Sequence, residues 1–131
     1  MMVGIVIVSH SAKIAEGICD LARQMGREGQ IILPAGGMPD GGIGTDAMLI
    51  YKSLIDADDG DGVIVLADLG SAVLSTETAF EFLCEEQRSR VAIADAPVVE
   101  GAILATVQAS VGAALPEVME AAISARELKK V

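Results

Sequence analysis

The residues best suited to chemistry in this chain follow two short apolar runs. His10, the single histidine, comes directly after the run at residues 3–8, and Asp68 comes directly after a second run at 63–67. An imidazole bonded to a carboxylate through one nitrogen has a fixed tautomer, and its other nitrogen is free to act as a nucleophile. The pair therefore indicates group transfer by way of a covalent histidine intermediate.

Small and hydroxylated residues surround both positions. Ser9 and Ser11 flank His10, and Gly70 and Ser71 lie in the loop that Asp68 begins. Backbone amides at the starts of the two following helices are expected to point outward at Ser11, Ala12, Ser71 and Ala72. Two helix N-termini that meet at one point bind anions, which suits a transferred phosphoryl group. Structural roles stay open as well, since Ser9, Asp68 and Ser71 could each cap a helix.

Short β-branched runs alternate with longer amphipathic ones along the chain. The runs predict strands over 3–8, 30–35, 63–67 and 90–94. Helical spacing predicts helices over 12–25, 45–57, 72–86, 97–111 and 116–130, with loops at 36–44, 58–62 and 68–71. This alternation is typical of an α/β fold with an open parallel sheet and helices on both faces. The first and third runs are apolar throughout, as central strands are, so the predicted strand order is 2-1-3-4, with Pro34 on an edge strand.

That strand order has a functional consequence. The chain turns in opposite directions after the first and third strands, and open α/β sheets bind ligands in the crevice at this switch point. We therefore expect His10 and Asp68 to face each other there. The glycine-rich loop Gly36–Gly44 lacks the Gly-Lys-Ser/Thr of a phosphate-binding P-loop, so we expect a flexible surface loop, followed by Thr45 as a helix cap.

Other chemistries lack the residues that they need. A two-component receiver requires an acidic pair after the first strand, where this chain has Ser9 and His10. The G-x-S-x-G of serine hydrolases and the G-x-G-x-x-G of dinucleotide-binding folds are missing. One histidine and one aspartate are too few ligands for a metal, so we expect no metal and no cofactor.

Composition narrows the class of protein. The chain has 131 residues, is 52% hydrophobic and carries a formal net charge of −10, which fits a single domain at 1–131 and disfavours nucleic acid and anionic membranes. No stretch approaches the roughly 20 apolar residues of a membrane span. Cys19 and Cys84 both fall in helical patterns and are expected to be buried in a reducing compartment. We expect a soluble cytoplasmic protein.

Four segments resemble the mannose-type enzyme IIA family of the bacterial phosphotransferase system: "IVIVSHS", "GTDA" (44–47), "ADLGSA" (67–72) and "APVVEGA" (96–102). Within it they are most similar to the phosphotransfer subunits of phosphoenolpyruvate-dependent dihydroxyacetone kinases, from Met1 to about Ala122. The resemblance implies that His10 is phosphorylated and that Asp68 orients it. It also places Gly70 and Ser71 in a phosphate-binding loop and Thr45 in a matching motif. The amides considered above add Ser11 to the expected phosphate-binding residues, with Ser9 and Leu69 as further site candidates.

The resemblance also implies partners. Phosphorylated HPr would be the donor, and ADP bound on a DhaL subunit would be the acceptor, with DhaK holding dihydroxyacetone. The chain would use separate HPr and enzyme I and would form a homodimer. Because each partner must leave after transfer, we expect a modest docking patch around His10, with Ile14 and Leu69 at its centre and acidic residues on its rim. Sugar-transport members exchange an extra strand within their dimers, whereas 116–130 is helical in pattern here. Two alternatives stay open: the enzyme IIA component of a mannose-type sugar transport system, and a regulatory protein linked to the phosphotransferase system.

Overall fold

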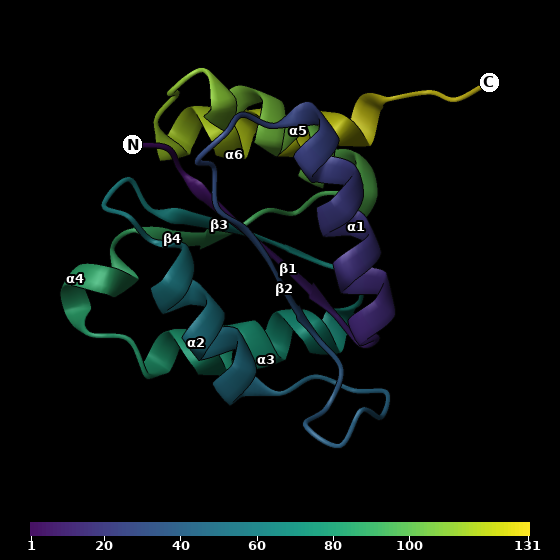
Figure 1. The fold of residues 1–131 in the computed structure, drawn as a ribbon, viewed down its shortest axis with the longest axis vertical. Coiled ribbons are helices and arrows are strands. Elements are labelled where there is room, and N and C mark those ends of the chain that lie inside the picture. Colours follow the sequence, from purple (N-terminus) through teal and green to yellow (C-terminus); the bar gives the residue numbers. More distant parts are fainter.

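The structure, a computed structural model, describes all of residues 1–131 and is built on a single four-stranded sheet (Figure 1). All strand pairs are parallel, and the order is β2-β1-β3-β4, as predicted. The strands are β1 (Gly4–Ser9), β2 (Ile32–Gly36), β3 (Val63–Ala67) and β4 (Val91–Ile93). β1 and β3 are therefore central, because their apolar side chains are covered on both faces, and Pro34 lies on an edge strand.

Helices cover both faces of the sheet, α1, α5 and α6 on one and α2 and α3 on the other (Figure 1). The helices are α1 (Ala12–Met25), α2 (Ala47–Ala57), α3 (Gly70–Glu81), α4 (Glu85–Arg88), α5 (Val98–Ser110) and α6 (Leu115–Ser124). The predicted α/β class with a doubly covered parallel sheet is thus confirmed.

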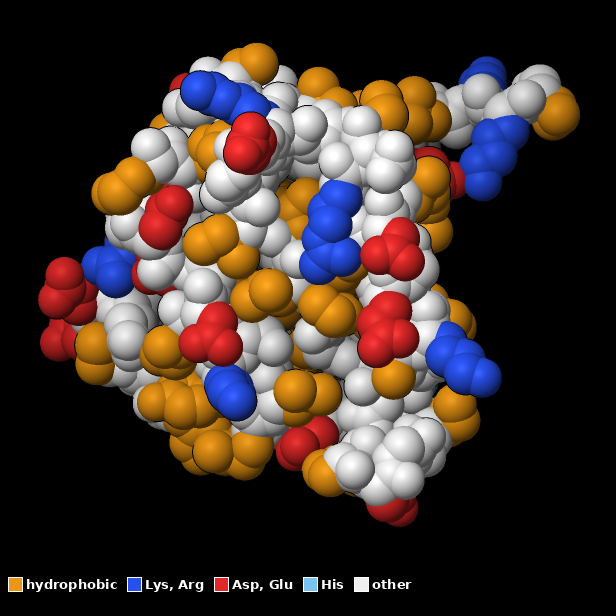
Figure 2. All heavy atoms as spheres, viewed as in Figure 1, with side chains coloured by type: hydrophobic (Ala, Val, Ile, Leu, Met, Phe, Trp, Pro, Cys, Tyr) orange, Lys and Arg blue, Asp and Glu red, His pale blue; other side chains and the backbone are white.

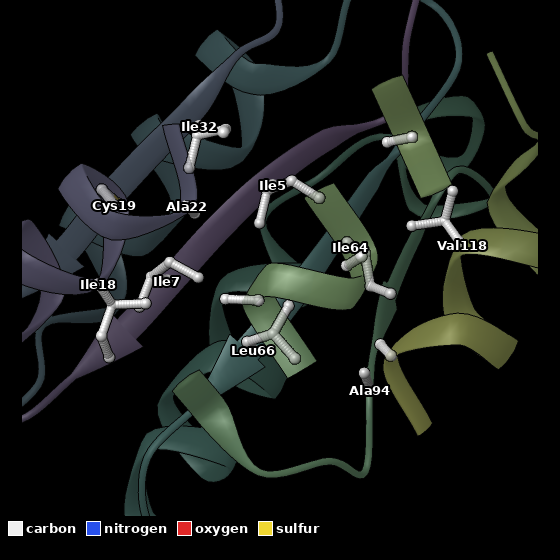
Figure 3. Close-up of a cluster of buried hydrophobic side chains, with 14 of the residues drawn as sticks. Ile5, Ile7, Ile18, Cys19, Ala22, Ile32, Ile64, Leu66, Ala94 and Val118 are labelled. Atoms are coloured by element: carbon white, nitrogen blue, oxygen red, sulfur yellow. The ribbon is translucent and has the colours of Figure 1, made fainter. Parts of the chain in front are cut away.

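Alternate residues of the central strands form two separate cores. Ile5 and Ile7 of β1 and Ile64 and Leu66 of β3 point toward α1, α5 and α6 (Figure 3). Their neighbours along the same strands, such as Val6, pack against α2 and α3 instead. Burial of both sets fixes the strand register, because a slip by one residue would exchange the two faces.

The predicted helix over 72–86 is wrong in its second half. α3 begins earlier, at Gly70, and ends at Glu81, after which a separate short helix, α4, begins. The Arg88 guanidinium donates hydrogen bonds to the carbonyls of Phe80 and Glu81 at the end of α3 and to that of Leu83 just beyond it. Cys84 caps α4 and is exposed, which corrects the expectation that both cysteines are buried; Cys19 is buried.

The C-terminal part also departs from prediction. The helix expected over 116–130 ends at Ser124, a 3-10 turn follows at Ala125–Glu127, and residues 128–131 project as an irregular segment (Figure 1). An ion pair of 2.7 Å between Lys130 Nζ and Glu100 Oε2 ties this segment to α5. Basic side chains are visible on the projecting segment in Figure 2, where acidic and apolar side chains are dispersed over the rest of the face. No helix reaches the length and apolar character that crossing a bilayer requires.

Candidate active site

The site lies where β1 and β3 end side by side. Val8 of β1 is paired with Ala67 of β3, so the residues that follow these strands leave the sheet at the same edge. The backbone N–H of Asp68 also donates to the carbonyl of Val8 over 3.1 Å. This local pairing brings His10 and Asp68 together at the switch point, although 58 positions separate them in the chain.

Asp68 accepts hydrogen bonds on both carboxylate oxygens. Oδ1 lies 2.9 Å from His10 Nδ1 and accepts from the backbone N–H of Leu69 over 2.7 Å. Oδ2 accepts from the hydroxyl of Ser9 over 2.8 Å and from the backbone N–H of His10 over 3.0 Å. Four donors therefore surround this one carboxylate and fix its plane.

The same contacts determine the protonation of Asp68. Burial by itself would raise the pKa of its carboxyl, but the hydrogen bonds from the His10 backbone, the His10 ring and the Ser9 hydroxyl outweigh it and hold the pKa below its usual value. An ionised carboxylate only accepts hydrogen bonds, so in the neutral ring the hydrogen is on Nδ1 of His10.

The other nitrogen of His10 faces outward. Nε2 contacts the hydroxyl of Ser71, in the first turn of α3. The His10 side chain is 22% exposed and that of Asp68 15%, so the ring is supported from behind and open at its tip. With hydrogen on Nδ1, Nε2 accepts the hydroxyl hydrogen of Ser71, and its lone pair becomes the nucleophile when that hydroxyl turns away.

The capping roles that the sequence left open are settled by the hydrogen bonds. Ser11 caps α1, and its hydroxyl accepts from the N–H of Ile14, while Ser9 does not cap. Leu69 is at the N-cap of α3 without a side-chain bond, so neither Asp68 nor Ser71 caps that helix. Leu69 is 63% exposed beside the site, and Ile14 on α1 is 51% exposed.

Two of the four expected outward amides are already engaged. The N–H of Ser11 donates to the Ser9 hydroxyl over 3.1 Å, and the N–H of Ala72 donates to the carbonyl of Leu69 over 3.0 Å. The expectation that both would face a bound anion is therefore wrong. The amides of Ala12 and Ser71 are the remaining candidates in the first turns of the two helices.

The glycine-rich loop is part of the site, whereas the sequence analysis favoured a flexible surface loop. The N–H of Gly37 donates to the carbonyl of Ser9 over 3.1 Å, and the N–H of Gly44 donates to the carbonyl of His10 over 2.8 Å. Both glycines have positive φ, +75° and +145°, a region that favours glycine. The loop thus holds the His10 turn from the side of β2 rather than lying apart on the surface.

Thr45 does not cap the helix after this loop. Asp46 is the N-cap of α2, and Thr45 Oγ1 instead lies 2.6 Å from Ser75 Oγ on α3. This contact joins the end of the loop to the helix that carries Ser71. Aspartate is a favoured N-cap residue, so the sequence offered Asp46 as a cap next to Thr45, and the prediction chose Thr45.

A cavity of about 460 Å³ opens beside Asp68, away from β2. Its walls include Asp68 and Gly70, residues of α3 such as Glu77, and the end of β4 with Asp95. No three side chains of His, Cys, Asp or Glu come together in the way that a metal site would need. The site thus offers one nucleophile, one orienting carboxylate and hydrogen-bond donors, which suits transfer of an anionic group.

Comparison with known proteins agrees with this geometry. The EIIA-man family, described as the PTS system fructose IIA component, matches residues 4–119. The chain belongs to this family. The fold and the resemblance inferred from the four segments are thereby confirmed.

Several relatives of this EIIA-man chain are described as the same kind of kinase subunit. It is 43% identical over 132 residues to "PEP-dependent dihydroxyacetone kinase, phosphoryl donor subunit DhaM" of Escherichia coli, a match that covers 98% of this chain and 28% of the relative. It is 41% identical over 110 residues to "PEP-dependent dihydroxyacetone kinase 2, phosphoryl donor subunit DhaM" of Listeria innocua, covering 84% of this chain and 88% of the relative. The chain thus spans little more than a quarter of the enterobacterial relatives and most of the Listeria one.

A solved structure shows the same fold. The crystal structure of EF1359, described as a protein of unknown function, superposes with a TM-score of 0.85 at 39% identity and covers 95% of each chain. A second structure, a sigma-54 interaction domain protein from Enterococcus faecalis, has a TM-score of 0.71 at 19% identity and supports the fold alone.

Proposed function

We propose that this EIIA-man chain is the phosphoryl donor subunit of a phosphoenolpyruvate-dependent dihydroxyacetone kinase. His10 takes a phosphoryl group from phosphorylated HPr and passes it to ADP bound on DhaL, and DhaK presents dihydroxyacetone to the ATP so formed. The descriptions of the Escherichia and Listeria relatives support this assignment.

One observation carries the proposal: Asp68 binds Nδ1 of His10 while Nε2 faces outward. A ring held in this way presents one lone pair to an incoming phosphorus atom and keeps its single hydrogen on the opposite side. As positive charge develops on the ring during attack, the adjacent carboxylate stabilises it.

The transfer step follows from this geometry. The lone pair of Nε2 attacks phosphorus as the nitrogen–phosphorus bond of the donor histidine breaks, and the donor ring keeps the electrons of that bond. His10 then carries the phosphoryl group on Nε2 and the hydrogen on Nδ1. Ser71 donates its hydroxyl to a phosphoryl oxygen, and the amides of Ser71 and Ala12 are the nearest helix-start donors. The reverse sequence delivers the group to the terminal phosphate oxygen of ADP.

The partners belong to the same proposal. HPr and DhaL must both leave after transfer, so the exposed side chains of Ile14 and Leu69 beside His10 suit a modest, transient docking patch. Residues 116–131 are helical or irregular, so in the proposed homodimer they supply no exchanged strand. Val107 and Val111 on the outer side of α5 and at its end are exposed and are candidates for the contact between copies.

Phosphorylation of the purified chain is the decisive experiment. The protein is incubated with labelled phosphoenolpyruvate, enzyme I and HPr, and the label is then challenged with acid and base. We expect an acid-labile, base-stable label that is lost in His10→Ala, with the fold unchanged by circular dichroism. The proposal would be refuted if the His10→Ala protein kept the label. It would also be refuted if the wild type took up no label while enzyme I and HPr were shown to be active.

A second acceptor has some support, since the family description is that of a sugar-transport IIA component. The phosphorylated chain is therefore offered DhaL with ADP, DhaK and dihydroxyacetone in one reaction and a mannose-type IIB protein in another. Sustained formation of dihydroxyacetone phosphate supports the kinase subunit. Transfer to the IIB protein alone would identify a transport component, and transfer to neither would favour the regulatory alternative.

A further inference from the structure

We infer that Ser9 is a positioning residue for phosphoryl transfer, whose hydroxyl sets the plane of the Asp68 carboxylate and thereby the tautomer of His10. The inference rests on the proposed function for its kinetic consequence. Its structural consequence, the position of one hydrogen on the imidazole, can be measured without any partner protein.

The direction of the Ser9 hydroxyl is fixed by its two neighbours. The oxygen accepts from the backbone N–H of Ser11 over 3.1 Å, and that group can only donate. The hydroxyl hydrogen must then point to Asp68 Oδ2, which is 2.8 Å away and only accepts. The chain of bonds from Ser11 to Ser9 to Asp68 has one direction, and such chains strengthen each member.

The Ser9 hydroxyl that makes this bond is buried. Ser9 is 0% exposed, the last residue of β1. The hydroxyl of Ser9 is therefore screened from solvent. Without it, Oδ2 keeps the His10 amide as its single partner, and the amide of Ser11 loses its acceptor inside the protein.

The contact at Oδ2 affects the histidine because it sets the orientation of the carboxylate plane. The Ser9 hydroxyl helps to keep Oδ1 in line with Nδ1, since the two oxygens rotate together about one bond. Ser9 holds Oδ2 from the strand, whereas the Leu69 amide holds Oδ1 from the loop. Loss of one anchor lets the carboxylate turn, weakens its bond to Nδ1 and allows hydrogen to populate Nε2, which then has no lone pair for phosphorus.

Apart from accepting the N–H of Ser11 in the turn, the Ser9 hydroxyl has Asp68 as its partner. Ser11, not Ser9, caps α1, and the neighbouring positions of β1 are all apolar and buried. A residue chosen for packing alone at the end of this strand would be apolar like Val8.

The test uses the single histidine as its own reporter. Protein labelled with ¹⁵N in its imidazole gives ring-nitrogen signals from His10 alone, and their shifts measure the share of each tautomer. We compare wild type, Ser9→Ala and Ser9→Thr, with Ser53→Ala as the control, because Ser53 is a buried serine on α2 outside the site. The rate of phosphorylation by phosphorylated HPr is measured on the same samples.

Ser9→Ala is expected to convert a pure Nδ1–H ring into a mixture and to slow phosphorylation about tenfold, the effect of one hydrogen bond to a charged group. Ser9→Thr, which keeps the hydroxyl, restores both readouts, and Ser53→Ala changes neither. Should Ser9→Ala fail to fold, Ser9→Cys, similar in shape with a weaker donor, shows the same tautomer shift to a smaller degree.

A folded Ser9→Ala protein, or Ser9→Cys in its place, whose ring remains entirely in the wild-type tautomer would overturn the inference. So would Ser9→Thr protein with the tautomer mixture of Ser9→Ala. If the wild type accepts no phosphoryl group, the proposed function fails by itself, and the tautomer measurement still decides the role of Ser9.

Discussion

Replacing Asp68 with asparagine tests the site most directly, because the amide has nearly the same shape and one acceptor fewer. The carboxylate accepts from four donors: the His10 ring and Leu69 amide on Oδ1, and the Ser9 hydroxyl and His10 amide on Oδ2. An asparagine has one oxygen and one NH2 group, so in either orientation its NH2 group faces two donors.

Both orientations impair the nucleophile. If the oxygen stays toward His10, the ring keeps its hydrogen on Nδ1 but its partner is neutral. If the NH2 group turns toward His10, Nδ1 must accept, the hydrogen moves to Nε2 and the lone pair there is lost. A hydrogen bond to a charged group contributes roughly 1.5–3 kcal/mol, which converts to phosphorylation about 10- to 100-fold slower.

Rapid-quench phosphorylation by phosphorylated HPr measures this loss. The control is Asp56→Asn, which removes one exposed carboxylate from α2 far from the site and leaves the net charge of the two variants equal. We expect the control to react at the wild-type rate. A folded Asp68→Asn protein that also reacts within twofold of wild type, with its ring hydrogen still on Nδ1, would refute the role assigned to Asp68.

Two further predictions concern stability. A Cβ at Gly36 would lie 2.6 Å from the carbonyl oxygen of Ser11, so Gly36→Ala should lower the free energy of unfolding in urea by about 1–3 kcal/mol. Gly17 lies in the middle of α1 with open space around it, so Gly17→Ala should raise that free energy by roughly 0.5–1 kcal/mol. Equal effects of the two substitutions would contradict the packing of α1 on β2. Burial favours a higher pKa for Asp58, but bonds from the amides of Gly60 and Gly62 and from Arg90 lower it below the usual 3.8. Because the folded pKa is the lower one, these bonds stabilise the fold above about pH 4, and the stabilisation is lost as the pH falls through the folded pKa. The unfolding free energies of wild type and Asp58→Asn should therefore differ at pH 7 and converge as the pH falls through the folded pKa, and a constant difference would refute the assignment.

Local pattern accounted for the sheet and for the pairing at its edge. The continuous apolar runs before Ser9 and Asp68 identified the two central strands, because only strands covered on both faces are apolar throughout. Parallel order then required the ends of these strands to meet. The His10–Asp68 pair could thus be inferred without coordinates.

Helical spacing that continues past the end of a helix led to wrong predictions of where two helices end. Helical spacing ran through residues 72–86, yet Arg88 reaches back to the carbonyls at the end of α3 and the chain begins a new helix at Glu85. Similarly, α6 gives way at Ala125 to a 3-10 turn. Hydrophobic periodicity does not register hydrogen bonds at helix ends, such as those of Arg88, and therefore misses these breaks.

The sequence by itself determined the order of the strands and the meeting of one imidazole with one carboxylate, because continuous apolar runs mark central strands and the ends of neighbouring parallel strands meet at one edge of the sheet. Only the tertiary structure decided which ring nitrogen Asp68 holds, that Ser9 completes the carboxylate's partners, and that Gly37, Gly44 and Thr45 attach the glycine-rich loop to the site. These are directed contacts between backbone and polar atoms, many of them far apart in the chain. Their geometry depends on side-chain rotation and on the path of a loop, and neither leaves a periodic trace in the residues.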